Sequence, residues 1–185
     1  MNITDFKMDY FSLKGKNAIV TGGNTGLGQA FSLALAKAGA NIFMPSIMPD
    51  DPSFNQLIEA EGAKAVYMAA DLTEEGTAKR IVETCAETLG SVDILVNCAG
   101  ICLCEEVTKF GRDLWDKMVS INLTAAFEMS HECAKVMIPQ NSGKIINICS
   151  LFAFLGCQLS PAYVATKHGI AGLTKAYSDE LGQYN

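Results

Sequence analysis

The chain has 185 residues, of which 49% are hydrophobic and 18% charged, and its formal net charge is −6. This length and composition exclude a disordered chain and fit one domain with a full hydrophobic core. The negative charge and the lack of lysine or arginine clusters argue against nucleic-acid binding, and the longest apolar runs are too short to span a membrane. We therefore expect one domain over residues 1–185 and, because the first residues do not resemble an export signal, a cytoplasmic location.

Short β-like runs alternate with helical patterns along the chain, which is typical of βαβ units. Strands are predicted at residues 17–20, 41–46, 65–69, 93–97 and 144–149, with helices between them. Thr73 can cap the helix after the third strand. A long helix is predicted over 112–137, ahead of Pro139, and a last one from about Tyr163 to near the end. This order predicts an α/β fold with a doubly wound parallel sheet and helices on both faces.

A glycine-rich turn follows the first predicted strand, with the sequence Thr21-Gly22-Gly23-Asn24-Thr25-Gly26-Leu27-Gly28. In a doubly wound sheet, ligands bind at the carboxyl ends of the strands, where free amides at a helix N-terminus can hold a pyrophosphate. Glycine lets the backbone approach such a ligand, although tight turns also need glycine for their own geometry. The spacing G-x3-G-x-G differs from the G-x-G-x-x-G fingerprint, so the turn alone leaves both interpretations open.

Tyr163 and Lys167 are four residues apart in the last predicted helix, so their side chains lie on one face. A tyrosine needs a nearby cation to favour its phenolate near neutral pH, and Lys167 is such a cation. Ser150 follows the fifth strand and is expected to point into the same crevice, where it can hydrogen-bond a carbonyl or hydroxyl oxygen. Taken alone, the Tyr-x3-Lys spacing is more typical of a solvated helix face.

Seven cysteines are spread along the chain. An odd number without an export signal predicts reduced thiols that pack as small hydrophobic side chains. Cys98, Cys102 and Cys104 form one cluster, for which His131 is the nearest candidate for a fourth metal ligand. The C-x3-C-x-C spacing differs from the C-x2-C pair that usually holds zinc, so we expect packed thiols and no metal.

Taken together, these motifs resemble the short-chain dehydrogenase/reductase family from Leu13 onward. The resemblance rests on the order and spacing of residues 21–28, Asp71-Leu72, Asn97-Cys98-Ala99-Gly100, Asn122, Ser150 and Tyr163-x3-Lys167. It implies a Rossmann-type, three-layer α/β/α fold and an oxidoreductase that transfers a hydride between NAD(P) and a secondary alcohol or ketone. Residues 11–16 and 143–148 are similar to those of gluconate and deoxygluconate dehydrogenases, which implies a sugar acid as substrate, but 3-oxoacyl-carrier-protein reductases share much of this pattern.

The resemblance also implies which residues hold the cofactor. The glycine-rich turn would contact the pyrophosphate and adenosine ribose, and the Asp-Leu pair the adenine. The full implied set is Gly22, Asn24, Thr25, Gly26, Leu27, Gly28, Ser46, Asp71, Leu72, Asn97, Ala99, Gly100, Tyr163 and Lys167. Cys98 replaces the family's usual second asparagine, and little functional effect is expected because backbone groups dominate that contact.

The implied catalytic residues are Asn122, Ser150, Tyr163 and Lys167. Tyr163 would exchange a proton with the substrate oxygen, Ser150 would orient the substrate, and Lys167 would bind the nicotinamide ribose and favour the Tyr163 phenolate. Asn122 would hold a water that links Lys167 to solvent. Because asparagine is unfavourable inside a helix, an inward hydrogen-bonding role explains it better than a surface position. His168 is expected to be a surface residue.

Cofactor choice depends on the residues after the second strand. Ser46 stands where family members that prefer NAD usually have an acidic residue. Neither Ile47 nor Asn24 or Thr25 offers the cation that a 2′-phosphate needs. We therefore expect NAD rather than NADP.

Family members continue beyond the position of Asn185 through two more strands and a substrate-covering loop, so the chain is expected to be a fragment of a longer protein. A natural short form stays open, and with it a catalytically idle nucleotide-binding or interaction module. The family implies a dimer or tetramer built from the helices near 112–137 and 163–182, whose outward faces are expected to carry Ala126, Met137, Ala171, Leu173 and Ala176. The chain alone is expected to expose an apolar patch and a sheet edge, to aggregate or need a partner, and to have little activity.

Overall fold

The computed structural model describes residues 8–184 and has one parallel sheet of five strands in the order β3-β2-β1-β4-β5. The strands are β1 (Asn17–Val20), β2 (Asn41–Ser46), β3 (Ala65–Ala69), β4 (Ile94–Asn97) and β5 (Lys144–Asn147). Ile19 of β1 pairs with Phe43 on one side and with Leu95 on the other, both in parallel register. The predicted parallel sheet is therefore confirmed, although the fifth strand ends two residues earlier than predicted.

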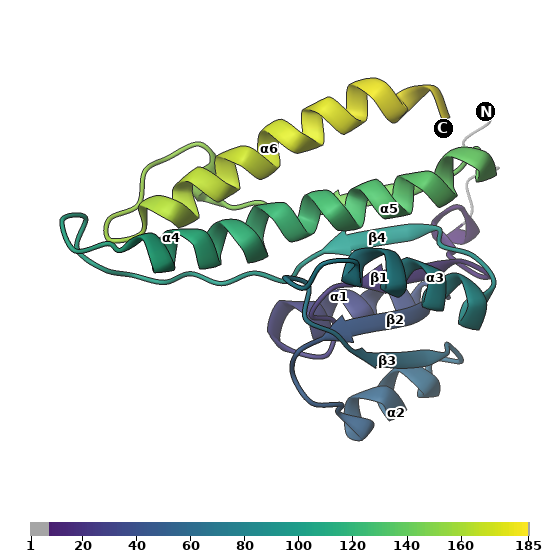
Figure 1. Cartoon of the computed structure of the whole chain (residues 1–185). Coiled ribbons are helices and arrows are strands. Elements are labelled where there is room, and N and C mark those ends of the chain that lie inside the picture. The colour runs from purple at the N-terminus through teal and green to yellow at the C-terminus, as the bar shows by residue number, and fades with distance from the viewer. Residues whose placement is uncertain (1–7, 185) are drawn as a thin grey trace.

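Helices cover both faces of this sheet (Figure 1). They are α1 (Gly26–Lys37), α2 (Pro52–Ala60), α3 (Thr77–Leu89), α4 (Arg112–Val119), α5 (Ala125–Gln140) and α6 (Pro161–Leu181), with short turns at Met8–Phe11, Leu151–Ala153 and Gly182–Tyr184. One core cluster packs α3 and α5 against the sheet, and a second packs α1 and α2 against its other face. Alternation in β2 serves both clusters, because Phe43 points to the first and Ile42 and Met44 to the second. The chain thus has the predicted doubly wound, Rossmann-like architecture.

The strand order places a crevice between β1 and β4. The chain passes outward from β1 through β2 to β3, and then returns to β4 on the opposite side of β1. The loops after β1 and β4 therefore leave the sheet in opposite directions, which opens a space at its carboxyl edge where ligands bind in folds of this kind.

The helix predicted over 112–137 is interrupted. A π-helical turn at Ser120–Thr124 separates α4 from α5, which runs on to Gln140 and includes Pro139. Because Pro139 is the second-last residue of α5, its missing amide removes only one hydrogen bond at an exposed helix end. The last helix begins at Pro161, two residues before the predicted start.

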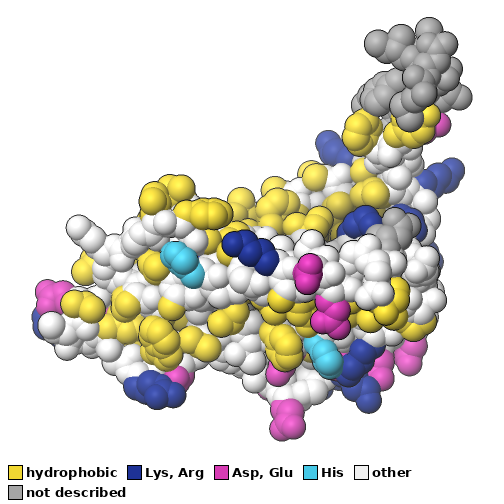
Figure 2. All heavy atoms as spheres, turned by 90° about the horizontal axis from the view of Figure 1, so that it is seen from above, with side chains coloured by type: hydrophobic (Ala, Val, Ile, Leu, Met, Phe, Trp, Pro, Cys, Tyr) yellow, Lys and Arg dark blue, Asp and Glu magenta, His cyan; other side chains and the backbone are white. Residues whose placement is uncertain are grey.

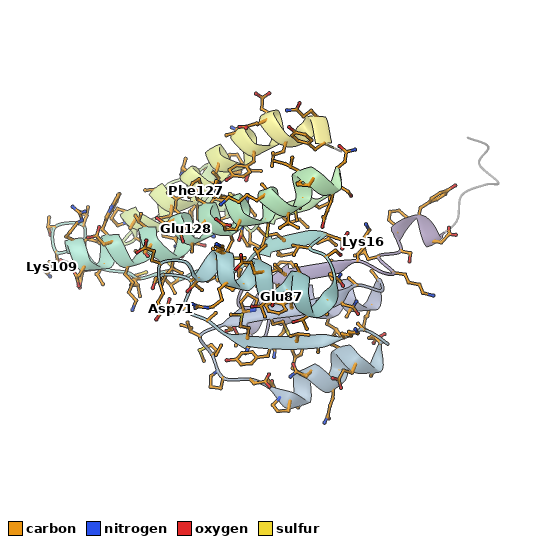
Figure 3. All side chains as sticks on the ribbon, turned by 45° about the vertical axis from the view of Figure 1, so that its right-hand side comes forward. Lys16, Asp71, Glu87, Lys109, Phe127 and Glu128 are labelled. Atoms are coloured by element: carbon orange, nitrogen blue, oxygen red, sulfur yellow. The ribbon has the colours of Figure 1, made fainter. Side chains whose placement is uncertain are left out.

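Two further expectations about local structure are wrong. Thr73 does not cap α3, which begins at Thr77 behind Gly76; its amide and hydroxyl instead donate to Asp71. Ala126 and Met137 are buried inside the single chain, so they are not on an outward face of α5. The exposed large apolar side chains of that helix are Phe127, which is 46% exposed and is labelled in Figure 3, and Ile138, which is 36% exposed.

The seven cysteines fall into three groups: two are buried, two are exposed, and Cys98, Cys149 and Cys157 are partly buried. Cys85 and Cys133 are buried in the core, as predicted for packed thiols. Cys102 and Cys104 are exposed, so the packing prediction is wrong for them. They follow β4 in a loop without regular secondary structure, and side chains in such loops are commonly exposed. Across residues 8–184, none of the helices combines the length and the apolar character that crossing a membrane requires.

Candidate active site

The glycine-rich turn connects β1 to α1 at the crevice. Gly22 and Gly26 have positive φ angles of 65° and 50°, which other residues adopt only with strain. A Cβ on Gly28 would collide with the carbonyl oxygen of Gly22, so only glycine lets the helix start this close to the strand. Thr25 precedes α1 without a side-chain capping bond, which leaves the first amides of the helix free. This cradle fits a pyrophosphate group.

Asn24 and Ser46 each hydrogen-bond a main-chain atom of Met48, in the loop after β2. The Asn24 amide nitrogen donates to the Pro49 carbonyl at 2.7 Å and to the Met48 carbonyl at 3.4 Å. Its Oδ1 atom is buried and has no hydrogen-bond partner among the described residues. The Ser46 hydroxyl is also buried, and it accepts from the Met48 amide at 3.1 Å. Both side chains therefore shape the loop after β2.

Asp71 and Leu72 follow β3 at the same edge. Asp71 is exposed (Figure 3), and hydrogen bonds from the amide and hydroxyl of Thr73 lower the pKa of its carboxyl group. Leu72 is half-buried and packs against the core cluster beneath α3. The carboxylate is thus free to accept a further donor from outside while Leu72 anchors the loop.

Thr21 braces the floor of the crevice, a role that motif spacing did not reveal. Its hydroxyl accepts from the amides of Cys98 and Ala99, both at 3.0 Å, and so ties the end of β1 to the loop after β4. Asn97 completes this brace, because its amide donates to the Asn147 side chain on β5 at 2.8 Å. The only signal in the sequence was a threonine placed between an apolar strand and a glycine.

Asn122 lies in the π-helical turn and points inward. Its amide group bonds both main-chain atoms of Ile101: Oδ1 accepts from the Ile101 amide and Nδ2 donates to the Ile101 carbonyl, each at 2.8 Å. Nδ2 also lies 3.4 Å from the Thr166 hydroxyl on α6. Gly100 packs directly beside this amide. Asn122 thus joins the loop after β4 to α6, where it contacts Thr166, the residue before Lys167.

Ser150, Tyr163 and Lys167 meet at the carboxyl end of β5. The Lys167 ammonium donates to the Ile148 carbonyl at 2.8 Å and lies 5.6 Å from the centroid of the Tyr163 ring. Tyr163 packs edge-on against Phe152, with 6.4 Å between ring centroids. The Ser150 hydroxyl accepts from the Phe152 amide at 3.2 Å, and this bond does not use its own proton. The segment from Ile148 to Phe152 therefore carries Ser150 and contacts both Tyr163 and Lys167 of α6.

Burial is the largest influence on the pKa of the Lys167 ammonium group. Desolvation lowers the pKa of its ammonium below the ordinary 10.5, while the nearby Cys149 and Cys98 thiols act in the opposite direction. Desolvation likewise raises the pKa of the Cys98 thiol, and Lys167 lowers it. His168 is exposed, with Nδ1 2.9 Å from the Val164 carbonyl, as expected for a surface residue.

Comparison with known proteins agrees with this arrangement. A sequence profile of the short chain dehydrogenase family matches residues 16–185. The chain is 61% identical to the Escherichia coli oxidoreductase YgcW, covering 100% of this chain and 70% of that protein. It is 40% identical to a Bacillus subtilis 2-dehydro-3-deoxy-D-gluconate 5-dehydrogenase, with coverages of 93% and 67%. A crystal structure of a putative Agrobacterium tumefaciens 2-deoxy-D-gluconate 3-dehydrogenase with bound NADP superposes with a TM-score of 0.85 at 36% identity, over 94% of this chain and 69% of that one. The chain therefore belongs to the short-chain dehydrogenase family.

Proposed function

We propose that this protein oxidises a secondary alcohol, or reduces the corresponding ketone, with NAD as its hydride carrier. The observation that supports this most strongly is the group formed by Ser150, Tyr163 and Lys167, which stands at the carboxyl edge of the same sheet as the glycine cradle. A dinucleotide that enters the cradle at one end would reach this group at the other.

Each side chain has a distinct task in this proposal. Tyr163 exchanges a proton with the substrate oxygen, and Ser150 donates its free hydroxyl proton to the same oxygen. The positive charge of Lys167 favours the phenolate of Tyr163 and offers donors to ribose hydroxyls. Asn122 holds the loop and α6 in register through Ile101 and Thr166. The nicotinamide supplies the hydride chemistry when it is bound.

The preference for NAD rests on charge. No lysine or arginine occurs between Ala38 and Gly62, and the loop after β2 instead continues into Asp50 and Asp51. A dianionic 2′-phosphate needs a cation, and carboxylates nearby repel it. The Agrobacterium tumefaciens structure contains NADP, whereas NAD is proposed for this chain.

A sugar acid is the proposed substrate, because relatives with this sequence pattern include 2-dehydro-3-deoxy-D-gluconate 5-dehydrogenases. The test is an assay of sugar acids and 3-hydroxy acids with NAD and with NADP, in which the absorbance of the reduced cofactor is monitored. It is run on this chain and on a chimera continued by the part of the Escherichia coli relative that follows the matched region. Oxidation of a gluconate-type acid with NAD is expected for the chimera. Turnover of 3-hydroxy acids alone would refute the substrate proposal.

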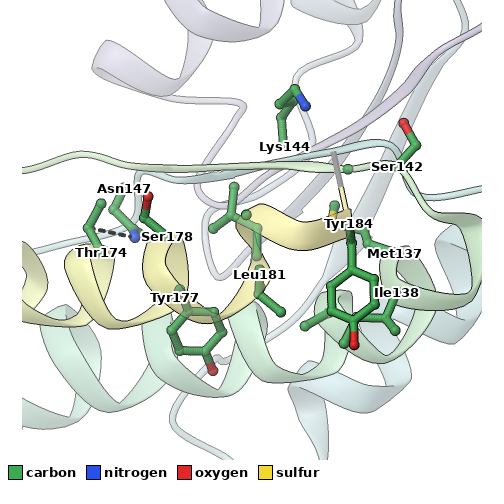
Figure 4. Close-up of a pocket in the computed structure, with 14 residues that line it drawn as sticks. Met137, Ile138, Ser142, Lys144, Asn147, Thr174, Tyr177, Ser178, Leu181 and Tyr184 are labelled. Atoms are coloured by element: carbon green, nitrogen blue, oxygen red, sulfur yellow. Dashed lines mark hydrogen bonds between the residues drawn. The ribbon is translucent and has the colours of Figure 1, made fainter.

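Assembly is the last part of the proposal. Ile146 of β5 is 44% exposed, and a groove between β5, the end of α5 and the end of α6 is lined by Ile145, Tyr177 and Leu181 (Figure 4). Hydrophobic side chains are spread over the face seen along α6 in Figure 2. Such a surface favours association in water. We therefore expect a homodimer or homotetramer for the active form, and aggregation or partner dependence with little turnover for the 185-residue chain alone.

A further inference from the structure

Tyr67 is part of none of the motifs above, yet it reaches the cofactor edge of the sheet. It lies on β3 and pairs with Met44 of β2, and Met44 is two residues from the end of β2 at Ser46. Its ring is half-buried, and its hydroxyl donates to the Met48 carbonyl at 2.9 Å. A strand residue therefore holds the main chain of the segment that follows the neighbouring strand, residues 47–49, which we call the ribose loop.

Asn24 holds the ribose loop from the other side. It belongs to the glycine turn, is 2% exposed, and donates to the carbonyls of Met48 and Pro49. The Met48 carbonyl thus accepts from two side chains that come from different parts of the fold. The buried Oδ1 of Asn24 has no donor in the described part of the chain, and a buried acceptor without a donor is unfavourable. A hydroxyl donor brought by a ligand would relieve it.

The ribose loop is also fixed at both of its ends. The Ser46 hydroxyl accepts from the Met48 amide at its start. Asp51 caps α2 at its end, where it accepts from the amides of Ser53 and Phe54 at 3.1 and 3.2 Å. Between these anchors, Ile47 is 70% exposed and projects no polar group. The shape of the loop is therefore set by hydrogen bonds between its main-chain atoms and the side chains of Asn24, Ser46 and Tyr67.

We propose that Tyr67 and Asn24 are positioning residues for cofactor selectivity, since they hold the ribose loop in the conformation that favours a ribose hydroxyl over a 2′-phosphate. This inference rests on the proposed function, because it assumes that the glycine cradle binds a dinucleotide. Without the clamp, the loop is expected to move and admit water, so an additional phosphate is hydrated there instead of meeting a fixed segment that carries no lysine or arginine. A rigid site loses less entropy on binding and discriminates better than a mobile one.

The experiment uses two nucleotides as probes: 5′-ADP, which has a free 2′-hydroxyl as in NAD, and 2′,5′-ADP, which carries the 2′-phosphate of NADP. Calorimetry measures the Kd of 5′-ADP and of 2′,5′-ADP for the wild-type chain, Tyr67→Phe, Asn24→Ala and the control Tyr177→Phe, which changes a tyrosine in the groove along α6. In Tyr67→Phe, the Kd of 5′-ADP is expected to rise about fivefold, the value of one lost hydrogen bond, while that of 2′,5′-ADP changes less than about twofold. Tyr177→Phe is expected to leave both unchanged.

Hydrogen exchange of the unliganded chain separates positioning from general destabilisation. Faster exchange in Tyr67→Phe is expected only in peptides that cover residues 46–51, and Asn24→Ala should act on the same peptides. The inference is overturned if 5′-ADP binds and Tyr67→Phe leaves the ratio of the two Kd values unchanged, or weakens both ligands equally. If the wild-type chain binds neither nucleotide, the proposed cofactor site fails and this inference fails with it.

Discussion

Lys167 and Tyr163 lie one helical turn apart on α6, with the ammonium nitrogen 5.6 Å from the centroid of the ring. The same ammonium donates to the Ile148 carbonyl at the end of the sheet, so it is pinned between strand and helix. In the proposed mechanism, the single positive charge of Lys167 therefore serves both cofactor binding and proton transfer at Tyr163.

Lys167→Met is expected to weaken NADH binding by at least about tenfold, because it removes a charged donor while keeping most of the side-chain volume. Burial lowers the pKa of Lys167 below 10.5, so the wild-type ammonium loses its proton at a lower pH than a free lysine does. Affinity should therefore fall as the pH rises through this lowered pKa. Fluorescence titration between neutral and alkaline pH checks this, and the variant should give a flat profile. A wild-type profile as flat as that of Lys167→Met would contradict the role.

Gly28→Ala is expected to raise the Kd of NADH by more than about tenfold, because the added methyl group meets the Gly22 carbonyl and must open the turn. Gly172→Ala is the matched control: it lies on α6 with open space around its Cβ position, and alanine there favours the helix. Calorimetry of both variants decides the matter. Equal affinities for NADH would show that the turn does not form the binding cradle.

Asp93→Asn tests the hydrogen bonds that the Asp93 carboxylate accepts beside the amino end of β1 from Lys16, Asn17 and Ser91. Burial raises the pKa of Asp93, but hydrogen bonds from Ser91, Lys16 and the Asn17 amide outweigh it and leave the pKa below 3.8. A carboxyl with a depressed pKa stabilises the fold above its unfolded pKa, and this stability is lost as the pH falls through the folded value. The variant should thus lose about 1–3 kcal/mol at pH 7. In urea titrations, the difference from wild type should shrink below about pH 4, and a difference that persists in acid would refute the electrostatic account.

Thiol accessibility follows from the layers of the fold. Cys102 and Cys104 are exposed, whereas burial raises the pKa of Cys85 to about 12 and that of Cys133 also well above its usual value. Iodoacetamide at mildly alkaline pH should modify the two exposed thiols first and the two buried ones only in denaturant. Peptide mass spectrometry over time measures this order. Rapid native labelling of Cys85 or Cys133 would mean that the core between the sheet, α3 and α5 is open.

The sequence predicted most clearly those strands whose residues are all buried. β1 and β4 are buried at every position, and their apolar runs identified them without ambiguity. The division of the long helix was not predictable, because the π-helical turn contains Asn122, whose amide bonds to Ile101 in a loop 21 residues away. Thr73 misled for a different reason: α3 begins only at Thr77, behind Gly76, so Thr73 lies too far from the helix N-terminus to cap it.

The candidate site was predictable only where motifs are local. Tyr163 and Lys167 share a helix face by spacing alone, and the structure places them so. The contact between Tyr67 and Met48 joins a strand to a loop 19 residues earlier, and a tyrosine in a strand usually signals packing. Tertiary contacts of this kind leave no periodic trace in the sequence.

The measurement that tests the central claim most directly is the turnover of Tyr163→Phe in the chimera that carries this chain. The phenol oxygen is lost, while the ring still packs against Phe152, so NADH binding should stay within about twofold of the parent. Oxidation of the best sugar acid with NAD should fall by at least about a hundredfold, the contribution of a positioned acid or base. If Tyr163→Phe turned over that substrate as fast as the parent, the proposed proton transfer at Tyr163 would be wrong.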